Sequence, residues 1–491
     1  MTRQSSAPNE HQMERNATMI NLDCLFYPKS IAVIGASPDV VRDRGGFFNC
    51  FKDKYKGKLF AVNPKYDDIK GVPCCPKITD IKEPIDYALI VLPRDRVPQA
   101  LDECVTAGVK YVLVFSSGFS EAGEKDLEQQ LIDILKKGPT RMIGPNCIGI
   151  HAPENGVLFY PSLPMEAQGD IAYFSQSGGH ALNFLVRGVS SGLEFNKVVS
   201  VGNQADLKIE DFMEYFAKDE KIKFICGYVE DIKQGERFKK LARHIVLDKK
   251  KPLVIWKGGR SDDGARATMS HTGAIAVPTK IWDSVMEQLG VINAETQIEM
   301  LDILVCLKHG FKPQGLNALI SVAGGGSSVE LTDAVSTSGL SVPTLSAEIQ
   351  EKIGATISRV NTSTANPVDL GMFGFDPKIF VATALEGEKD PNIDLVVLCQ
   401  YPEMVRAMAR EFWDYIETTM SDGLKDLKKP AVMVIPRLLH NNPELEAIRA
   451  GFTAKLAAVN IAAFPNAERP ARAAYKINKY INFMKNHGIT I

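Results

Sequence analysis

A histidine within a run of small residues is the first candidate for chemistry in this sequence. The segment Ser270–Ala274 reads Ser-His-Thr-Gly-Ala and follows a predicted buried strand at 252–257, and we expect it to form a loop. With no bulky neighbour, the His271 imidazole could act as a nucleophile, and adjacent hydroxyls and glycine N–H groups could bind the oxyanion it acquires. If it attacks a phosphoryl group, His271 is a phosphate carrier. Taken alone, the five residues also fit an ordinary surface-loop histidine.

The elements that position this histidine follow the pattern of parallel α/β units. Short β-branched runs alternate with segments of helical composition, such as 97–107 and 124–137. In the first third of the chain we expect strands at 30–34, 58–62, 87–92, 111–115 and 141–143, which form a Rossmann-like sheet ending near Gly149.

Two further series of strands follow. The second is expected at 170–174, 198–201, 224–228 and 252–256, and the third at 317–322, 395–399, 431–435 and 462–464. Glycine and proline at 308–315 indicate a linker between them. The sequence therefore predicts a polar, flexible tail at 1–20 and three doubly wound domains at 21–150, 151–310 and 311–491.

Glycine and hydroxyl clusters fall directly after the predicted strands, where ligands bind in such sheets. In the first domain they are Gly35–Pro38, Leu92–Asp95, Ser116–Gly123 and Ile143–Gly149. The Gly35 turn lacks the G-x-G-x-x-G spacing, and Asn63-Pro64-Lys65 replaces the acidic residue that reads an NAD ribose. This pattern disfavours NAD and favours a ligand with an additional phosphate, with a simple strand–helix turn as the alternative.

The second and third domains carry similar clusters. Ser175–Gly179 leads from a strand into a helix, whose N–H groups and dipole would bind an anion. Glu230 ends another strand and could accept a hydrogen bond from the N–H of the His271 imidazole, or could be a solvated charge. In the third domain Gly324–Ser328 is either a phosphate cradle or a tight turn.

Composition limits the classes of function. The chain has 491 residues, 45% hydrophobic and 24% charged, and a formal net charge of −2, which gives no reason to expect nucleic acid or an anionic membrane as partner. The sequence contains no run of 18 apolar residues, so it predicts no membrane span. Nine cysteines without metal-ligand spacing predict a reduced, cytoplasmic protein without a metal site.

The order of these motifs resembles the α subunit of ADP-forming acyl-CoA synthetases, relatives of the succinyl-CoA synthetase α subunit. The resemblance runs from about residue 22 to 480 and rests on motifs at 34–37, 62–65, 117–121, 144–149, 175–178, 202–206, 270–273, 366–370 and 464–469. It implies a CoA-binding Rossmann-like domain followed by two flavodoxin-like domains. Two departures are Asp231, where relatives usually have glycine, and Gly326-Ser327-Ser328 after the glycine pair.

The resemblance also assigns roles to residues. It implies that His271 is phosphorylated during turnover and that Glu230 orients it. Phosphate binding is implied for Ser175, Ser177, Gly178, Ser270, Thr272 and Gly273. Binding of CoA and of the acyl thioester is implied for Gly35, Ala36, Ser37, Lys65, Pro93, Ser117, Gly118, Phe119, Glu121, Asn146 and Cys147.

The implied reaction is carboxylic acid + CoA + ATP ⇌ acyl-CoA + ADP + phosphate. Such enzymes also need an ATP-grasp module, and the sequence shows no glycine-rich hairpin followed by a lysine-bearing strand and an acidic metal pair. We therefore expect ATP, ADP and Mg²⁺ to bind a separate ATP-grasp β subunit. The alternatives are a catalytically silent CoA-binding protein, disfavoured by the Ser-His-Thr-Gly segment, and a nicotinamide-dependent oxidoreductase.

Overall fold

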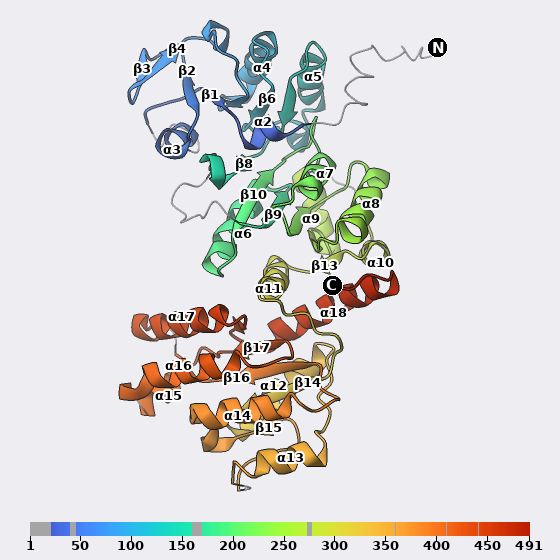
Figure 1. The fold of residues 1–491 in the computed structure, drawn as a ribbon. Coiled ribbons are helices and arrows are strands. Elements are labelled where there is room, and N and C mark those ends of the chain that lie inside the picture. Colours follow the sequence, from blue (N-terminus) through green and yellow to red (C-terminus); the bar gives the residue numbers. More distant parts are fainter. Residues whose placement is uncertain are drawn as a thin grey trace. The chain divides into compact units, whose positions relative to one another are not determined.

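The protein is described here by a computed structural model, in which residues 21–39, 46–159, 169–272, 277–358, 360–408, 410–439 and 441–491 can be described. Side chains at 269–272, 408 and 410 are outside that description. Contacts divide the chain into two compact units, one ending at Gln297 and the other beginning at Ile298. The elements of both units are drawn in Figure 1.

The first sheet has the Rossmann strand order. Its strands are β1 (Ser30–Ile34), β2 (Lys58–Val62), β3 (Asp68–Ile69), β4 (Val72–Cys75), β5 (Tyr87–Ile90), β6 (Tyr111–Val114) and β7 (Arg141–Ile143). The order is β3-β4-β2-β1-β5-β6-β7, and all neighbours are parallel except the β3–β4 pair. Without the edge strand β3 this is the 3-2-1-4-5-6 order, in which the direction of winding reverses between β1 and β5. The accompanying helices are α2 (Asp23–Phe26), α3 (Phe47–Lys54), α4 (Val97–Thr106) and α5 (Lys125–Leu135).

The second sheet, in the same unit, has the flavodoxin order. Its strands are β8 (Gly149–His151), β9 (Ile171–Ser175), β10 (Phe195–Ser200), β11 (Phe224–Val229), β12 (Leu253–Lys257) and β13 (Ile292–Ala294). The order is β13-β12-β11-β9-β10-β8, with β8 antiparallel to β10 and the other neighbours parallel. The five parallel strands give the 2-1-3-4-5 order. The helices are α6 (Gly178–Ser190), α7 (Ile209–Lys218), α8 (Gly235–Arg243), α9 (Asp262–Thr272) and α10 (Thr279–Leu289).

The third sheet belongs to the second unit and repeats the flavodoxin order. It consists of β14 (Ala318–Val322), β15 (Val368–Asp369), β16 (Leu395–Cys399), β17 (Ala431–Val434) and β18 (Ala462–Phe464), all parallel, in the order β15-β14-β16-β17-β18. The helices are α11 (Gln297–Lys308), α12 (Gly325–Thr337), α13 (Ala347–Gly354), α14 (Pro377–Gly387), α15 (Pro402–Met408), α16 (Trp413–Leu424), α17 (Pro443–Ala458) and α18 (Glu468–Asn486). Asp302 of α11 accepts a 2.8 Å hydrogen bond from Nε of Arg469 on α18, so α11 is tied to this unit.

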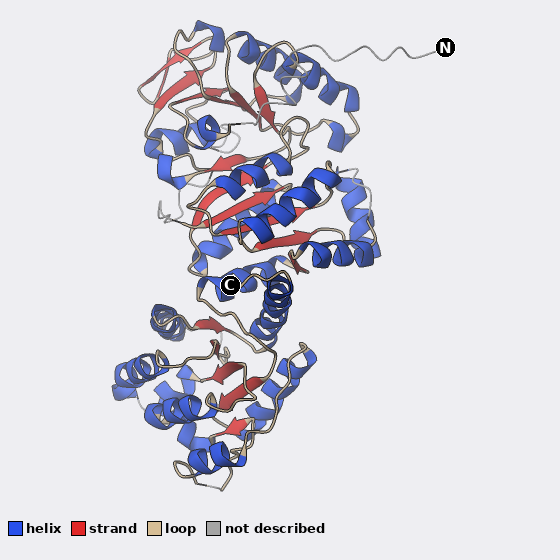
Figure 2. Ribbon diagram, turned by 45° about the vertical axis from the view of Figure 1, so that its right-hand side comes forward, coloured by secondary structure: helices blue, strands red, loops and turns tan. Residues whose placement is uncertain are grey.

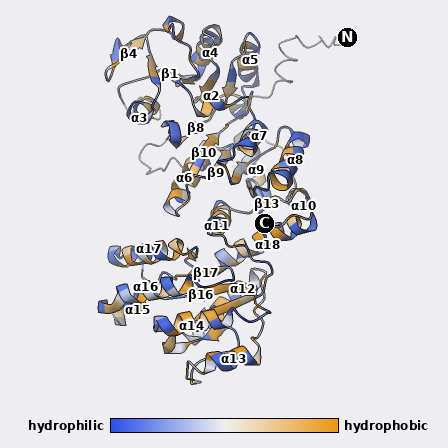
Figure 3. Ribbon diagram, in the orientation of Figure 1, coloured by the Kyte–Doolittle hydropathy of each residue, from blue (hydrophilic) through white to orange (hydrophobic). Residues whose placement is uncertain are grey.

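Helices cover both faces of each sheet, which explains why the strands are continuous apolar runs (Figure 2). Every residue of β1, β5, β6, β9, β14 and β16 is buried. In Figure 3 the strands are mostly in hydrophobic colours, whereas the covering helices show both hydrophobic and hydrophilic colours. This confirms the predicted α/β class with parallel sheets. No helix in the described part of the chain is long and apolar enough to span a membrane.

Candidate functional site

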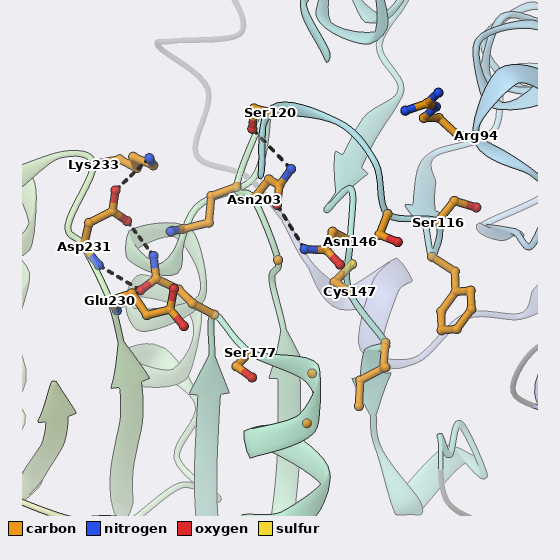
Figure 4. Close-up of a pocket in the computed structure, with 18 residues that line it drawn as sticks. Arg94, Ser116, Ser120, Asn146, Cys147, Ser177, Asn203, Glu230, Asp231 and Lys233 are labelled. Atoms are coloured by element: carbon orange, nitrogen blue, oxygen red, sulfur yellow. Dashed lines mark hydrogen bonds and ion pairs between the residues drawn. The ribbon is translucent and has the colours of Figure 1, made fainter. Parts of the chain in front are cut away.

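A cavity of about 440 Å³ lies in the first unit, where the loops after the strands of its two sheets meet (Figure 4). Its walls come from both sheets and are rich in amide, hydroxyl and charged groups. The lining residues are Arg94, Phe115, Ser116, Ser117, Ser120, Asn146, Cys147, Ile148, Gln176, Ser177, Gly178, Gly179, Gly202, Asn203, Gln204, Glu230, Asp231 and Lys233. Of the predicted site residues, Ser117, Asn146, Cys147, Ser177, Gly178 and Glu230 share this cavity.

The loop after β7 brings Asn146 and Cys147 to the cavity. Asn146 has a positive φ of 61°, a conformation that asparagine tolerates better than most residues, and its N–H donates to the carbonyl of Ser116 at 3.0 Å. Cys147 is only 3% exposed, and burial raises the pKa of its thiol. Burial thus favours the neutral thiol, and Cys147 forms part of the cavity wall.

The loop after β6 is shaped by its own side chains. Glu121 accepts hydrogen bonds from the N–H groups of Gly118 and Phe119, and the Phe119 ring is fully buried in the core of the first sheet. Ser117 is exposed and lines the cavity. The contacts of Glu121 and Phe119 therefore fix this loop. The carbonyl of Gly118 accepts a hydrogen bond from Arg94 Nη1 at 3.2 Å.

The turn after β10 connects the two sheets. The Asn203 side chain donates to Ser120 Oγ at 3.2 Å and to Glu128 Oε2 at 2.8 Å, and its backbone N–H donates to the carbonyl of Pro145 at 3.0 Å. Gly202 approaches the same loop so closely that a Cβ there would lie 2.2 Å from that carbonyl oxygen. No individual role was predicted for Asn203 from the sequence, although it lies in one of the motifs that carry the family resemblance.

The N-terminus of α6 offers donors for an anion. Ser177 is its N-cap, and the Ser177 hydroxyl oxygen accepts from His180 N at 3.3 Å. Ser175 is fully buried. Its hydroxyl donates to the carbonyl of Ser177 at 2.7 Å and so stabilises the turn before α6. Gly178 and Gly179 line the cavity at the start of a 13-residue helix, where the dipole and free N–H groups favour a phosphate.

Glu230 follows β11 at the neighbouring strand end. It is 7% exposed, and Tyr228 donates its hydroxyl to Glu230 Oε1 at 3.1 Å. Gln176 joins the ends of β9 and β11, because its Oε1 accepts from the N–H groups of Glu230 and Asp231. Its Nε2 donates to Asp231 Oδ1 at 2.7 Å, and Asp231 forms an ion pair with Lys233 at 2.7 Å. Asp231, the departure from the family pattern, thus stabilises the turn that holds Glu230.

The predicted loop at 270–272 is wrong, because Ser270, His271 and Thr272 form the last turn of α9. The helix begins with Asp262 and Asp263, whose charges favour a helix N-terminus, and continues through alanines with high helix propensity. These helix signals lie at 262–269, before the Ser-His-Thr-Gly motif. The loop was predicted from the motif alone, and that prediction did not take them into account. The side chains of 270–272 and the whole of Gly273 lie outside the described residues, so the structure does not place the His271 imidazole.

The remaining predicted CoA-binding residues lie at the point where the first sheet reverses its winding. Gly35 has φ of +90°, and a Cβ there would lie 2.5 Å from the carbonyl oxygen of Val91, so this close approach of β1 and β5 requires glycine. Ala36 accepts a hydrogen bond from Asn63 Nδ2 at 2.8 Å, and Ser37 is buried. Lys65 and Pro93 are exposed at the ends of β2 and β5. These five residues do not line the cavity.

The second unit has a separate cavity of about 1010 Å³ at the β14–β16 strand ends. It includes the predicted glycine loop, Gly324–Gly326. The N–H groups of Gly324 and Gly371 donate to Asp369 Oδ1 at 3.2 and 2.9 Å, so a carboxylate already lies at this turn.

Comparison with known proteins identifies the class. Residues 29–153 match a CoA binding domain, and residues 168–307 match a succinyl-CoA ligase like flavodoxin domain. The chain is 32% identical over 95% of its length, and 99% of the relative, to the α subunit of acetate–CoA ligase [ADP-forming] II of Pyrococcus furiosus. The chain therefore belongs to the family of ADP-forming acetate–CoA ligases and their α subunits.

Two further matches define the extent of the similarity. Acetate–CoA ligase [ADP-forming] I of Archaeoglobus fulgidus is 34% identical over 78% of this chain, but the match covers only 55% of that longer relative. The solved structure of the dinucleotide-forming acetyl-coenzyme A synthetase 1 of Ca. Korarchaeum cryptofilum, in complex with phosphate and ADP, has a TM-score of 0.79. It is 28% identical, and the match covers 96% of this chain and 99% of that chain.

Proposed function

We propose that this chain is the CoA-binding and phosphoryl-carrying subunit of an ADP-forming acid–CoA ligase that activates a small carboxylic acid. The reaction is carboxylic acid + CoA + ATP ⇌ acyl-CoA + ADP + phosphate. One observation carries the proposal: the predicted thioester residues Asn146 and Cys147, the N-terminus of α6 and the carboxylate of Glu230 line one cavity. An acyl group, a phosphate and an orienting carboxylate can therefore meet there.

The chemistry divides among these groups. In the direction from acyl-CoA, phosphate displaces CoA to give an acyl phosphate, and His271 then takes the phosphoryl group and releases the carboxylic acid. The N–H groups at Gly178 and Gly179 would bind the phosphate. Glu230 would accept a hydrogen bond from the N–H of one imidazole nitrogen and so leave the other nitrogen free to attack.

CoA would extend from this cavity along the first sheet. Its thiol end would lie near Asn146 and Cys147, and its phosphates near the Gly35–Ser37 turn and Lys65. Ligands of doubly wound sheets bind where the winding reverses, which in the first sheet is the β1–β5 point beside Gly35. The described contacts of Glu121 and Phe119 support a role in shaping the loop that carries Ser117.

The nucleotide would bind a partner subunit with an ATP-grasp module and Mg²⁺. The longer relative from Archaeoglobus fulgidus supports a second part, since 45% of it lies outside the match. The nine cysteines, all free thiols, support a reducing, cytoplasmic location.

The test uses the full chain without a partner. Incubation with acetyl-CoA and ³²P-labelled phosphate should label His271 through an acid-labile, base-stable bond. The chain alone should not convert acetate, CoA and ATP to acetyl-CoA, whereas co-expression with an ATP-grasp subunit should. Label on another residue, or ATP-dependent ligation by the chain alone, would overturn the proposal.

A further inference from the structure

One residue that lines the cavity carries a buried hydrogen-bond donor with no partner among the described residues. Gln204, in the turn after β10, lines the cavity and is only 3% exposed, yet its side-chain Nε2 has no hydrogen-bond partner among the described residues. Nearly all buried polar groups are paired in folded proteins, so such a donor points to a ligand atom that accepts from it.

The other amide side chains of the cavity are engaged. The NH₂ group of Gln176 donates to Asp231 at 2.7 Å, that of Asn203 donates to Ser120 and Glu128, and that of Asn146 donates to Asn203 Oδ1 at 3.4 Å. These three amides hold the walls together. Gln204 differs from them because its NH₂ group has no hydrogen-bond partner among the described residues.

The Gln204 amide is also held in one orientation. Its Oε1 accepts from the N–H of Ile209, the first residue of α7, at 3.0 Å. Its backbone has φ of +57°, and its carbonyl accepts from Lys208 Nζ at 3.3 Å. With the oxygen engaged by a helix N-terminus, the NH₂ group is fixed in advance, and no reorganisation is needed when a ligand oxygen arrives.

The turn that carries Gln204 lies against the predicted thioester residues. Asn203 N donates to the carbonyl of Pro145, and Ala205 N donates to the carbonyl of Gly144 at 3.1 Å, so residues 203–205 run beside the loop that presents Asn146 and Cys147. Ser177 and Gly178, the predicted phosphate site, line the same cavity. In the proposed reaction the acyl group lies between the thiol end of CoA and the phosphate. A ligand oxygen at that place would therefore be the carbonyl oxygen of the acyl group.

We propose that Gln204 donates its Nε2–H to the carbonyl oxygen of the acyl group during exchange between thioester and acyl phosphate, an inference that rests on the function proposed above. A phosphate oxygen attacks the thioester carbon, and the C=O π electron pair moves to the oxygen, where Gln204 binds the developing negative charge. When that pair returns, the C–S bond breaks. CoA leaves as a thiolate that takes the proton brought by the phosphate, and the acyl phosphate remains.

The test separates this step from the transfer to His271. Two ³²P donors are used with the full chain: phosphate plus acetyl-CoA, which requires attack at the carbonyl, and acetyl phosphate, which can phosphorylate His271 directly. Gln204→Met keeps the approximate shape and removes the donor, together with the oxygen that accepts from Ile209 N. It should slow labelling from acetyl-CoA plus phosphate by about 10²–10³-fold, as expected for loss of one oxyanion donor. Labelling from acetyl phosphate should fall by less than about tenfold, because little charge develops on the carbonyl oxygen in that step.

Controls distinguish the possible failures. Gln350→Met removes a glutamine NH₂ that donates to Leu345 in the second unit, and both labelling rates should stay within about twofold of the wild type. Equal losses from both donors in Gln204→Met, or no loss from either, would overturn the role of Gln204 and leave the proposed function standing. A wild-type chain labelled by neither donor would overturn both.

Discussion

Strands β9 and β14 each run into a glycine-containing turn and a 13-residue helix, in two sheets with the same strand order. Around α6 the cavity is polar, and Ser177 caps the helix while Gly178 and Gly179 line the cavity. Around α12 the carboxylate of Asp369 accepts from the turn. A carboxylate at a helix N-terminus is stabilised there and disfavours a second anion. Equivalent topology thus provides two possible sites, and the side chains favour phosphate at α6.

The residues around the two cavities also differ in polarity, and those around α6 are the more polar. The α12 cavity has an apolar rim, in which Val360 and Met372 are 73% and 70% exposed. The α6 cavity is lined by amides, hydroxyls and the Glu230–Asp231–Lys233 turn. If the chemistry belongs to the first unit, substitutions there should affect phosphoryl transfer, and comparable substitutions elsewhere should not.

The largest effect is expected at His271. His271→Ala should lower turnover of the two-subunit enzyme by roughly 10⁴-fold or more, since it removes the nucleophile. The measurement is acyl-CoA formation together with CoA binding by calorimetry, and CoA affinity should change little. His244→Ala, at an exposed histidine paired with Asp248, is the matched control. Substantial turnover by His271→Ala would remove the basis for assigning the chemistry to this unit.

Glu230→Gln should have the next largest effect. The amide keeps the size of the side chain but cannot hold an imidazolium by charge, and loss of such an orienting partner typically costs about 10–100-fold. The rate of His271 labelling from acetyl-CoA and phosphate measures it. Glu236→Gln alters an exposed carboxylate of α8 paired with Lys239 and should leave the rate unchanged. Equal rates in the two variants would exclude an orienting role for Glu230.

A smaller effect is expected for a substitution of Lys65, which tests whether CoA binds at the strand ends of the first sheet. Lys65→Glu should weaken CoA binding by about fivefold, because reversing one exposed charge changes the binding free energy by roughly 1 kcal/mol. Dephospho-CoA should bind almost equally to both proteins if Lys65 meets the 3′-phosphate. Lys82→Glu, on the same domain, controls for net charge. Equal losses for CoA and dephospho-CoA would give Lys65 another role.

The smallest effect compares the two helix turns directly. Ser177→Ala removes the N-cap of α6 and should lower the free energy of unfolding by about 1 kcal/mol and slow His271 labelling several-fold. Ser327→Ala changes a hydroxyl in the turn of α12 and should leave labelling within about twofold. Thermal unfolding and the labelling rate provide both readouts. A larger effect from Ser327→Ala would reverse the assignment of the phosphate site.

Several strand positions could be predicted from the sequence to the exact residue. β1, β2, β7, β16 and β18 have the predicted bounds. The strands β3, β4, β8, β13 and β15 were missed; they are two to four residues long, and β4 contains a proline. In these short strands the pairing depends on neighbours brought from elsewhere, and the sequence shows no periodicity.

The sequence by itself determined the α/β class and most of the residues that line the cavity, because parallel strands bring their carboxyl ends to one edge and the glycine and hydroxyl clusters follow those ends. Only the tertiary structure decided how these residues are used. Burial and hydrogen bonding made Glu121 and Phe119 shape a loop and engaged Gln176 with Asp231. They left Nε2 of Gln204 without a partner among the described residues. Such differences depend on contacts between segments far apart in the chain, which residue types and local spacing do not encode.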